Sequence, residues 1–155
     1  MRAQVESEMT ARPLPFTVNE YAGDGSWQDS AGQRGRFTTE FKIVDEPNNT
    51  LVQITRRCFL KEDGGPLYEE NSEVRFTRLE GNFVEVTIRA AGKEHDGRGY
   101  VWGNVCHYEL EVDAGVQVEN TYTFVDGRLE LIGSSTNKGN ITIWGEVLVA
   151  GQSSA

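Results

Sequence analysis

Polar side chains that could do chemistry recur at alternating positions of the strand-like segments. Arg56 shares a face with Val52 and Ile54, and Tyr108 shares one with Leu110. A buried guanidinium, phenol or amide is costly unless it is partnered, and a wet cavity that holds a small molecule would supply partners. The candidate ligand-binding residues are Arg56, Trp102, Asn104, Tyr108, Asn120 and Tyr122.

Each residue type has a chemical role and a structural alternative. Arg56 could grip a ligand carboxylate through two parallel hydrogen bonds, or lie near a rim and pair with a structural acid. Tyr108 and Tyr122 could bind a ligand, act as general acids, or simply pack with satisfied hydroxyl groups. The two asparagines need polar partners if they face the interior. Trp102 would either line the cavity or pack in its wall.

Motifs for catalysis, nucleotide binding and metal binding are missing. The sequence has no phosphate-binding glycine loop and no Gly-x-Ser-x-Gly elbow. His95, in a predicted loop, and His107, on an outer face beside Glu109, come without a cysteine cluster, so a zinc site has no support. Cys58 and Cys106 are predicted to point inward as small apolar residues, and a disulfide between them stays open. We expect no metal and no cofactor, and the sequence does not decide whether the chain is an enzyme.

These side chains need strands to position them. β-branched and aromatic residues recur between turn signals, whereas a period of 3.6 residues is missing. Asp126-Gly127, between two alternating runs, is the strongest hairpin signal, because a type I′ turn needs positive φ at both central positions. The predicted strands cover residues 16–27, 36–45, 51–61, 68–79, 83–91, 99–112, 116–125, 128–136 and 141–149.

Three turns predict the strand register independently of one another. They are a two-residue turn at 126–127 and three-residue turns at 113–115 and 80–82. All three place apolar residues opposite apolar ones on a single face, and a slip of one residue would reverse the whole set. The inward pairs are Phe124–Leu129, Tyr122–Leu131, Leu110–Val118, Tyr108–Asn120, Cys106–Tyr122, Phe76–Val86 and Val74–Ile88.

The last hairpin does not fit this pattern. A two-residue turn at 138–139 would put Leu131 opposite Glu146 and leave three aliphatic residues of the last strand on the outer face. A loop of odd length, or a bulge at a nearby glycine, would reset the register. A third option is that the last strand buries Trp144 and Leu148.

The strand pattern predicts an all-β fold, a single antiparallel up-and-down β-barrel of about eight or nine strands with little or no helix. A two-sheet sandwich is the alternative. The barrel domain would cover residues 16–151 after a flexible arm at 1–15. The net charge of −9 argues against nucleic acid as a partner. Without an apolar span or a signal peptide, we expect a cytoplasmic protein with no membrane insertion, and a dimer is one option for its oligomeric state.

Gly25-Ser26-Trp27 matches the Gly-x-Trp signature of the first strand in the lipocalin-like barrels of the calycin superfamily, and strand order and chain length agree with it. The chain therefore resembles this family, although the Thr-Asp-Tyr type motif between later strands is absent. The resemblance implies that Trp27 plugs the closed end of the barrel under a basic residue from near the C-terminus. No Arg or Lys follows Lys138. The family resemblance also implies a small, largely apolar ligand, and a minority of the family's members are enzymes.

We therefore predict that the chain binds a small, partly apolar or amphipathic ligand, which could bear a carboxylate, inside a barrel cavity. The first alternative is a barrel enzyme of the cyclase, isomerase or lyase type, with Tyr108 or Tyr122 as proton donor and Arg56 as electrophilic stabiliser. The second alternative is a packed barrel that acts as an interaction module through its outer face.

Overall fold

The structure is a computed structural model that describes residues 19–151. This part of the chain forms ten strands and no helix. Alternating burial along the strands, as in β2, gives each an inward and an outward face. The strands are β1 (Glu20–Asp29), β2 (Arg34–Glu46), β3 (Thr50–Leu60), β4 (Pro66–Arg78), β5 (Phe83–Ala90), β6 (Lys93–Trp102), β7 (Val105–Val112), β8 (Val116–Val125), β9 (Arg128–Asn137) and β10 (Asn140–Ala150).

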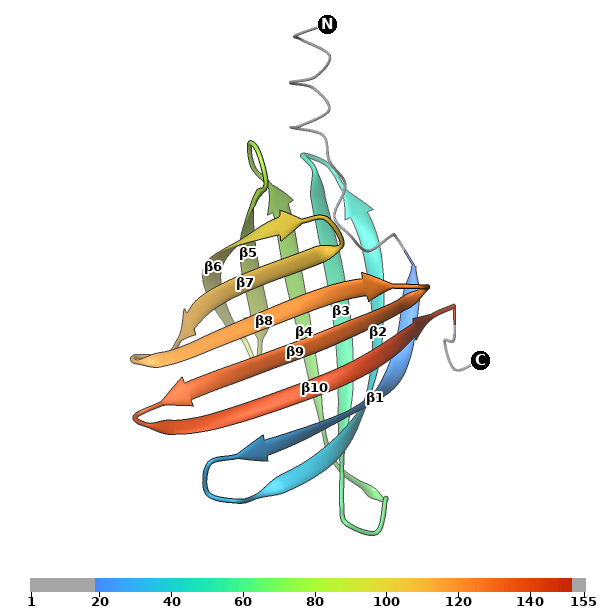
Figure 1. Cartoon of the computed structure of the whole chain (residues 1–155), viewed down its shortest axis with the longest axis vertical. Helices are drawn as coiled ribbons and strands as arrows, with labels where there is room; N and C mark the ends of the chain where they lie inside the picture. Colours follow the sequence, from blue (N-terminus) through green and yellow to red (C-terminus); the bar gives the residue numbers. More distant parts are fainter. Residues whose placement is uncertain (1–18, 152–155) are drawn as a thin grey trace, which may run out of the picture.

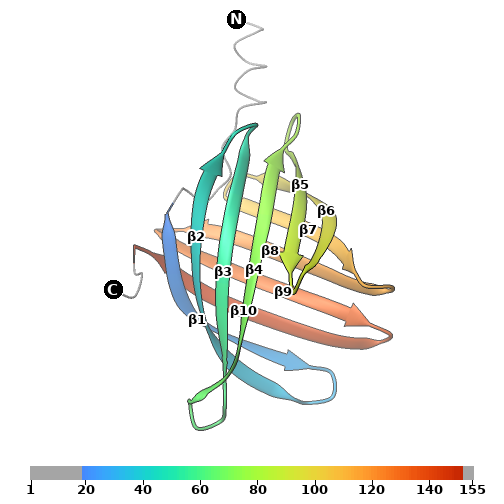
Figure 2. The same cartoon turned by 180° about the vertical axis from the view of Figure 1, so that it is seen from behind.

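Each strand pairs antiparallel with its neighbours in the sequence, and β1 pairs with β10, so the sheet closes into an up-and-down barrel. Closure removes the unpaired strand edges that would invite pairing with other chains. In Figure 1, β7 to β10 cross in front of β2 to β5, and Figure 2 shows the same crossing from behind. The predicted all-β antiparallel barrel is confirmed, with ten strands in the described residues instead of eight or nine. The arm predicted at residues 1–15 lies outside that range.

The register that the three turns predict is confirmed. Tyr108 lies opposite Asn120, and Tyr122 lies opposite Leu131. The turn between β8 and β9 has positive φ at both central residues, as a type I′ turn requires. Turn chemistry therefore determined which side chains of β7, β8 and β9 share the interior.

The last hairpin keeps its two-residue turn, with positive φ at residues 138 and 139. Leu131 does lie opposite Glu146, and β10 turns Trp144, Glu146 and Leu148 inward. Of the three options, the one in which the last strand buries Trp144 and Leu148 is correct. It brings a carboxylate into the barrel between two apolar side chains.

A turn at Gly103-Asn104 splits the strand predicted at residues 99–112 into β6 and β7. Gly103 has a φ of +59° at the first central position, which is typical of a type II′ hairpin turn. The turn reverses the side-chain alternation ahead of it, so Trp102 points outward with 71% of its surface exposed. The loop predicted around His95 is also wrong, because residues 93–102 form β6 against β5.

β3 faces the interior with the parity opposite to the predicted one. Residues 47–49 connect β2 to β3 as a three-residue loop, and Phe41 therefore lies opposite Thr55. Gln53, Thr55 and Arg57 face inward, while Arg56 faces outward. Apolar residues occur at both parities of this strand, so their alternation alone could not identify the inner face.

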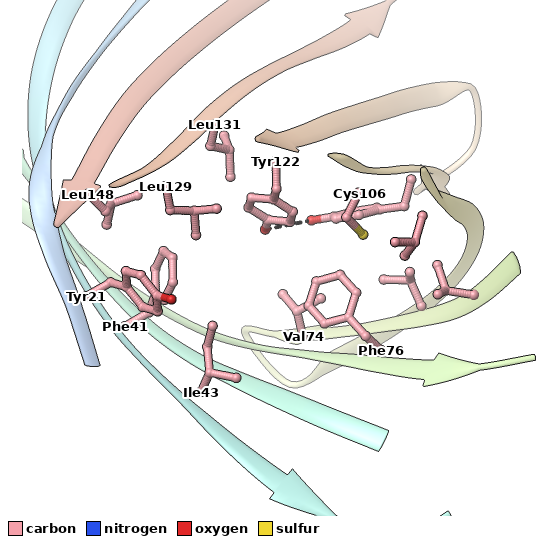
Figure 3. Close-up of a cluster of buried hydrophobic side chains, with 14 of the residues drawn as sticks. Tyr21, Phe41, Ile43, Val74, Phe76, Cys106, Tyr122, Leu129, Leu131 and Leu148 are labelled. Carbon is pink, nitrogen blue, oxygen red and sulfur yellow. Dashed lines mark hydrogen bonds between the residues drawn. The ribbon is translucent and has the colours of Figure 1, made fainter. Parts of the chain in front are cut away.

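Apolar side chains fill the half of the barrel where β1 begins (Figure 3). Tyr21 and Phe41 pack with ring centroids 5.3 Å apart, and Ile43, Phe76 and Leu129 join them with almost no exposed surface. Burial of this cluster supplies most of the hydrophobic stabilisation of the fold. Residues 19–151 contain no helix that is long and apolar enough to cross a membrane.

Candidate functional site: a cavity inside the barrel

The other half of the barrel is hollow. A cavity of about 400 Å³ lies between the inner faces of β1 to β5 and β7 to β10. Its volume falls in the range of small-molecule sites, about 300–1,000 Å³. Tyr68 and Glu70 are exposed and mark its rim. The lining residues used below are Trp27, Gln53, Arg57, Ser72, Ile88 and Trp144.

Glycines on the inner face make room for the two tryptophan rings. Gly35 lies opposite Trp27, and Gly133 lies opposite Trp144. A Cβ atom at Gly35 would lie 2.5 Å from Nε1 of Trp27, and one at Gly133 would lie 2.2 Å from Nε1 of Trp144. Each ring therefore occupies the space that a side chain would take on the next strand.

A buried ion pair stands at the cavity wall. Arg57 donates to both carboxylate oxygens of Glu146, from Nη2 at 2.5 Å and from Nε at 3.3 Å. Thr39 Oγ1 donates a third hydrogen bond to Oε2 of the same carboxylate at 2.6 Å. The Glu146 side chain is fully buried, whereas that of Arg57 remains 21% exposed. Burial opposes the charge on Arg57, but the neighbouring carboxylate outweighs it and raises the pKa of Arg57.

A chain of hydrogen bonds links β10 to β7 across β8. Trp144 Nε1 donates to Oδ1 of Asn120, and Nδ2 of Asn120 donates to the Tyr108 hydroxyl, both at 3.0 Å. The hydroxyl groups of Tyr108 and Tyr122 lie 3.5 Å apart. Burial raises the pKa of both tyrosines, so they remain neutral hydrogen-bonding groups at neutral pH.

Gln53 leaves one polar atom beside the cavity without a partner. The residue is 2% exposed, and its Nε2 donates to Oγ1 of Thr55 at 2.8 Å. Its Oε1 is buried and accepts no hydrogen bond from any residue in the range 19–151. Leaving such an acceptor unsatisfied costs roughly 1–3 kcal/mol, and a ligand N–H or O–H group would remove that cost.

Half of the predicted ligand-binding residues do lie at the cavity, and their binding role stays a prediction. They owe this position to the confirmed registers of β7 and β8. The three residues are Tyr108, Asn120 and Tyr122.

The predicted inward placement of the other three residues is wrong. Arg56 lies on the outer wall with 60% of its side chain exposed and pairs with Glu69 at 2.9 Å. Trp102 is exposed on β6. Asn104 occupies the β6–β7 turn, where its Nδ2 donates to the backbone oxygen of Phe124 at 2.8 Å. For Trp102 and Asn104 the error arises because side-chain alternation was continued through an unrecognised turn. For Arg56 it arises because the inner face of β3 was assigned without a register to a neighbouring strand.

Three polar residues at or beside the cavity that the prediction did not name matter most here: Gln53, Arg57 and Glu146. Glu146 had a signal in the sequence, because the simplest turn at 138–139 already placed it opposite Leu131. An inward carboxylate calls for an inward cation, and Arg57 stands next to Arg56 in the sequence. The register with Glu146 opposite Leu131 therefore predicts an inward cation, and Arg57 is a candidate for it.

Trp27 is not part of the packed apolar cluster, and its role as a plug of the closed end of the barrel stays a prediction. It lines the cavity instead, beside Trp144 on the neighbouring strand. The two thiols are free, and Cys58 lies on β3 at an even position, outward like Arg56. Cys106 is fully buried, as predicted, and burial raises its pKa to about 12.

The outer wall also carries a group that could hold a divalent cation. The ligand atoms of His107, Glu109 and Glu119 lie within 4.8 Å of one another. Nδ1 of His107 lies 2.9 Å from Oγ1 of Thr121, which leaves Nε2 for a metal. These side chains alternate with the inward residues of β7 and β8, so the group has no access to the cavity.

Comparison with known proteins gives the fold but no family. No protein-family model and no curated protein matches the chain. The crystal structure of Rv2717c from M. tuberculosis is similar over 87% of this chain and 92% of that one, with a TM-score of 0.66 and 15% identity. The S-type phycobiliprotein lyase CPES from Guillardia theta is similar over 89% and 90%, with a TM-score of 0.68 and 10% identity. At these identities the likeness supports the barrel fold alone, and membership of the calycin superfamily stays a prediction.

Proposed function

We propose that the chain binds one small, largely apolar ligand inside the barrel. The observation that carries the proposal is the 400 Å³ cavity with aromatic walls and a few convergent polar groups. The unpartnered Oε1 of Gln53 gives such a ligand an acceptor to bind. Arg57, which lines the cavity and keeps part of its surface exposed, gives it a donor.

The ligand that fits this cavity best is uncharged. Arg57 already binds Glu146 through two nitrogens, so a ligand carboxylate would compete with a buried acid for the same cation. Two carboxylates that share one cation in a low dielectric repel each other. An uncharged planar molecule with one hydrogen-bond donor and one acceptor could bind Gln53 and Arg57 and contact the aromatic lining without that repulsion.

Binding without turnover is favoured over the enzyme alternative. A proton-donating enzyme would use Tyr108 or Tyr122, which both line the cavity. Burial raises the pKa of both phenols and makes them weaker acids, which is the wrong direction for general-acid catalysis at neutral pH. The electrophilic role predicted for Arg56 fails, because that residue is on the outer wall. One similar barrel is named a lyase, but at 10% identity that name does not support a lyase reaction in this chain.

The proposal can be tested with N-phenyl-1-naphthylamine, an uncharged two-ring amine whose fluorescence rises in apolar surroundings. Ser72 lines the cavity, whereas its neighbour Asn71 is exposed on the outer wall. We expect wild type to bind the probe, Ser72→Trp to bind at least about tenfold more weakly, and Asn71→Trp to bind like wild type. No binding by wild type, or equal binding by the two tryptophan variants, would reject the interior site.

A further inference from the structure

A second hollow lies on the outer wall of the barrel. This groove, of about 730 Å³, is formed by residues of β1, β2, β9 and β10 together with Leu60 at the end of β3 and residues 61–62 after it. Ser26 and Gly145 lie opposite each other at its floor. A Cβ atom at Gly145 would meet only the backbone oxygen of Leu131, at 3.7 Å, so small residues keep the floor low. Trp27 and Trp144 stand in the wall between this groove and the interior cavity.

One side of the groove is aliphatic and exposed. Ile132 on β9 is 70% exposed, and Ile143 on β10 is 52% exposed. Outward strand positions usually carry polar side chains, and two neighbouring isoleucines in a hollow give an apolar body something to bind.

The other side is cationic. Arg34, Arg36 and Lys61 line the groove together with a single acid, Glu62. Within residues 19–151, none of these three cations has an ion pair or a side-chain hydrogen bond. Because the whole chain has a net charge of −9, a cluster of unpaired cations at one place is not expected from composition.

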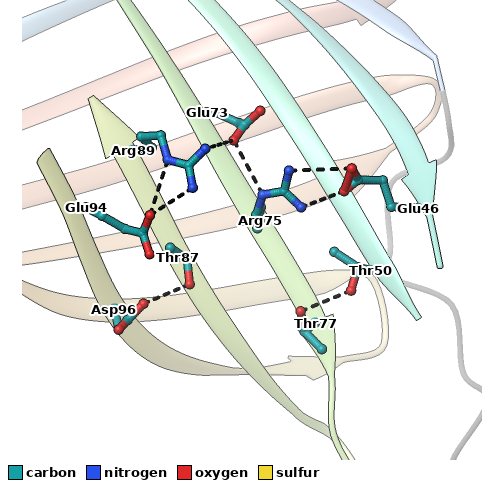
Figure 4. Close-up of polar contacts among 9 residues, drawn as sticks. All are labelled: Glu46, Thr50, Glu73, Arg75, Thr77, Thr87, Arg89, Glu94 and Asp96. Carbon is teal, nitrogen blue, oxygen red and sulfur yellow. Dashed lines mark hydrogen bonds and ion pairs between the residues drawn. The ribbon is translucent and has the colours of Figure 1, made fainter. Parts of the chain in front are cut away.

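Two arginines on β4 and β5, away from the groove, do form ion pairs (Figure 4). Arg75 pairs with Glu46 at 2.6 Å, and Arg89 pairs with Glu94 at 2.9 Å, with Glu73 between the two arginines. Both of these arginines therefore have carboxylate partners. The groove does not supply them, although its arginines are just as able to bind a planar anion through two parallel hydrogen bonds.

We propose that this groove binds a small organic anion with an apolar body, as a site separate from the interior cavity. Arg34, Arg36 and Lys61 bind the anionic group, and Ile132 and Ile143 contact the apolar body. The groove has the volume of a site for one small molecule. A second copy of the chain is disfavoured as its occupant because both copies carry −9, and the same charge repels an anionic membrane surface.

The test compares 8-anilinonaphthalene-1-sulfonate with N-phenyl-1-naphthylamine, which share the same rings and differ by the sulfonate. Isoleucine methyl NMR locates each probe, because Ile132 and Ile143 line the groove and Ile88 lines the cavity. We expect the sulfonate to shift the methyl signals of Ile132 and Ile143, and the uncharged amine to leave them unshifted.

Charge variants complete the test. Arg34→Gln with Arg36→Gln should weaken sulfonate binding at these methyl groups at least about tenfold, because charge-assisted hydrogen bonds are the stronger kind. Lys42→Gln with Arg98→Gln removes the same charge elsewhere on the barrel and should leave the affinity unchanged.

Three results would overturn the groove proposal: sulfonate shifts at Ile88 alone, equal shifts by both probes at Ile132, or equal losses in the two double variants. Tighter binding of an acidic peptide than of the sulfonate at Ile132 and Ile143 would replace the small anion by a peptide partner. Failure of the interior site is seen separately, as an absence of shifts at Ile88 with the uncharged amine.

Discussion

Removing the buried carboxylate of Glu146, the partner of Arg57, should destabilise the barrel far more than removing the exposed carboxylate of Glu69, the partner of the adjacent Arg56. Glu146→Gln keeps the shape of the side chain but leaves the Arg57 guanidinium without its counter-charge, and it weakens the hydrogen bond from Thr39. Breaking a buried pair by loss of one partner costs about 3–5 kcal/mol. Because Arg57 is 21% exposed and the glutamine can still accept a hydrogen bond, we expect about 3 kcal/mol.

The assay is equilibrium unfolding in urea followed by tryptophan fluorescence. With a slope of about 2 kcal/mol per molar urea, the loss corresponds to a midpoint lower by about 1.5 M. The matched control is Glu69→Gln, which breaks the exposed pair with Arg56 and should leave the midpoint almost unchanged. If Glu146→Gln does not fold, the double variant Arg57→Leu with Glu146→Leu should, because an apolar pair can replace a buried ion pair. Equal midpoints for Glu146→Gln and Glu69→Gln would refute the reasoning.

Three further predictions concern packing and the thiols. Gly133→Ala should lower the free energy of unfolding by about 1–3 kcal/mol, since its Cβ would collide with the Trp144 ring, whereas Gly145→Ala should not lower it. Equal effects of the two substitutions would contradict the claim that Gly133 makes room for the Trp144 ring. In native protein at pH 8, a thiol reagent should label Cys58 and spare the fully buried Cys106 until urea unfolds the chain; rapid labelling of both would show that the interior opens. Burial raises the pKa of Cys106 from 9.0 to about 12, so its thiol ionises first in the unfolded chain. Stability should therefore hold below pH 9, fall by about 1.4 kcal/mol per pH unit between pH 9 and pH 10, and fall more steeply above pH 10, where the buried Tyr108 and Tyr122 add to the loss; stability that stays flat to pH 11 would refute this.

The barrel and the registers of β7 to β9 could be predicted because local turn chemistry determines them. Asp126-Gly127 requires one turn geometry, and that geometry places Tyr122 opposite Leu131. A two-residue turn at 138–139 likewise places Glu146 inside the barrel. That position conflicts with an apolar interior only as long as its partner Arg57 is unknown.

Residues without such a turn were not predictable to the same degree. On β3 the apolar residues occur at both parities, so a loop of three residues instead of four reverses which of Arg56 and Arg57 points inward. Trp102 was placed on the wrong face because Gly103-Asn104, a dipeptide typical of a two-residue hairpin turn, was taken as part of one continuous strand. The cavity itself depends on tertiary packing, since the positions of the rings of Trp27 and Trp144 are set by glycines on other strands.

The interior ligand site is tested most directly by intermolecular nuclear Overhauser effects from bound N-phenyl-1-naphthylamine to the methyl groups of the protein. We predict contacts to Ile88, Val74 and Leu131, which line the cavity, and none to Ile132 or Ile143 on the outer wall. Contacts only to the outer isoleucines, or none at all, would contradict a ligand site inside the barrel.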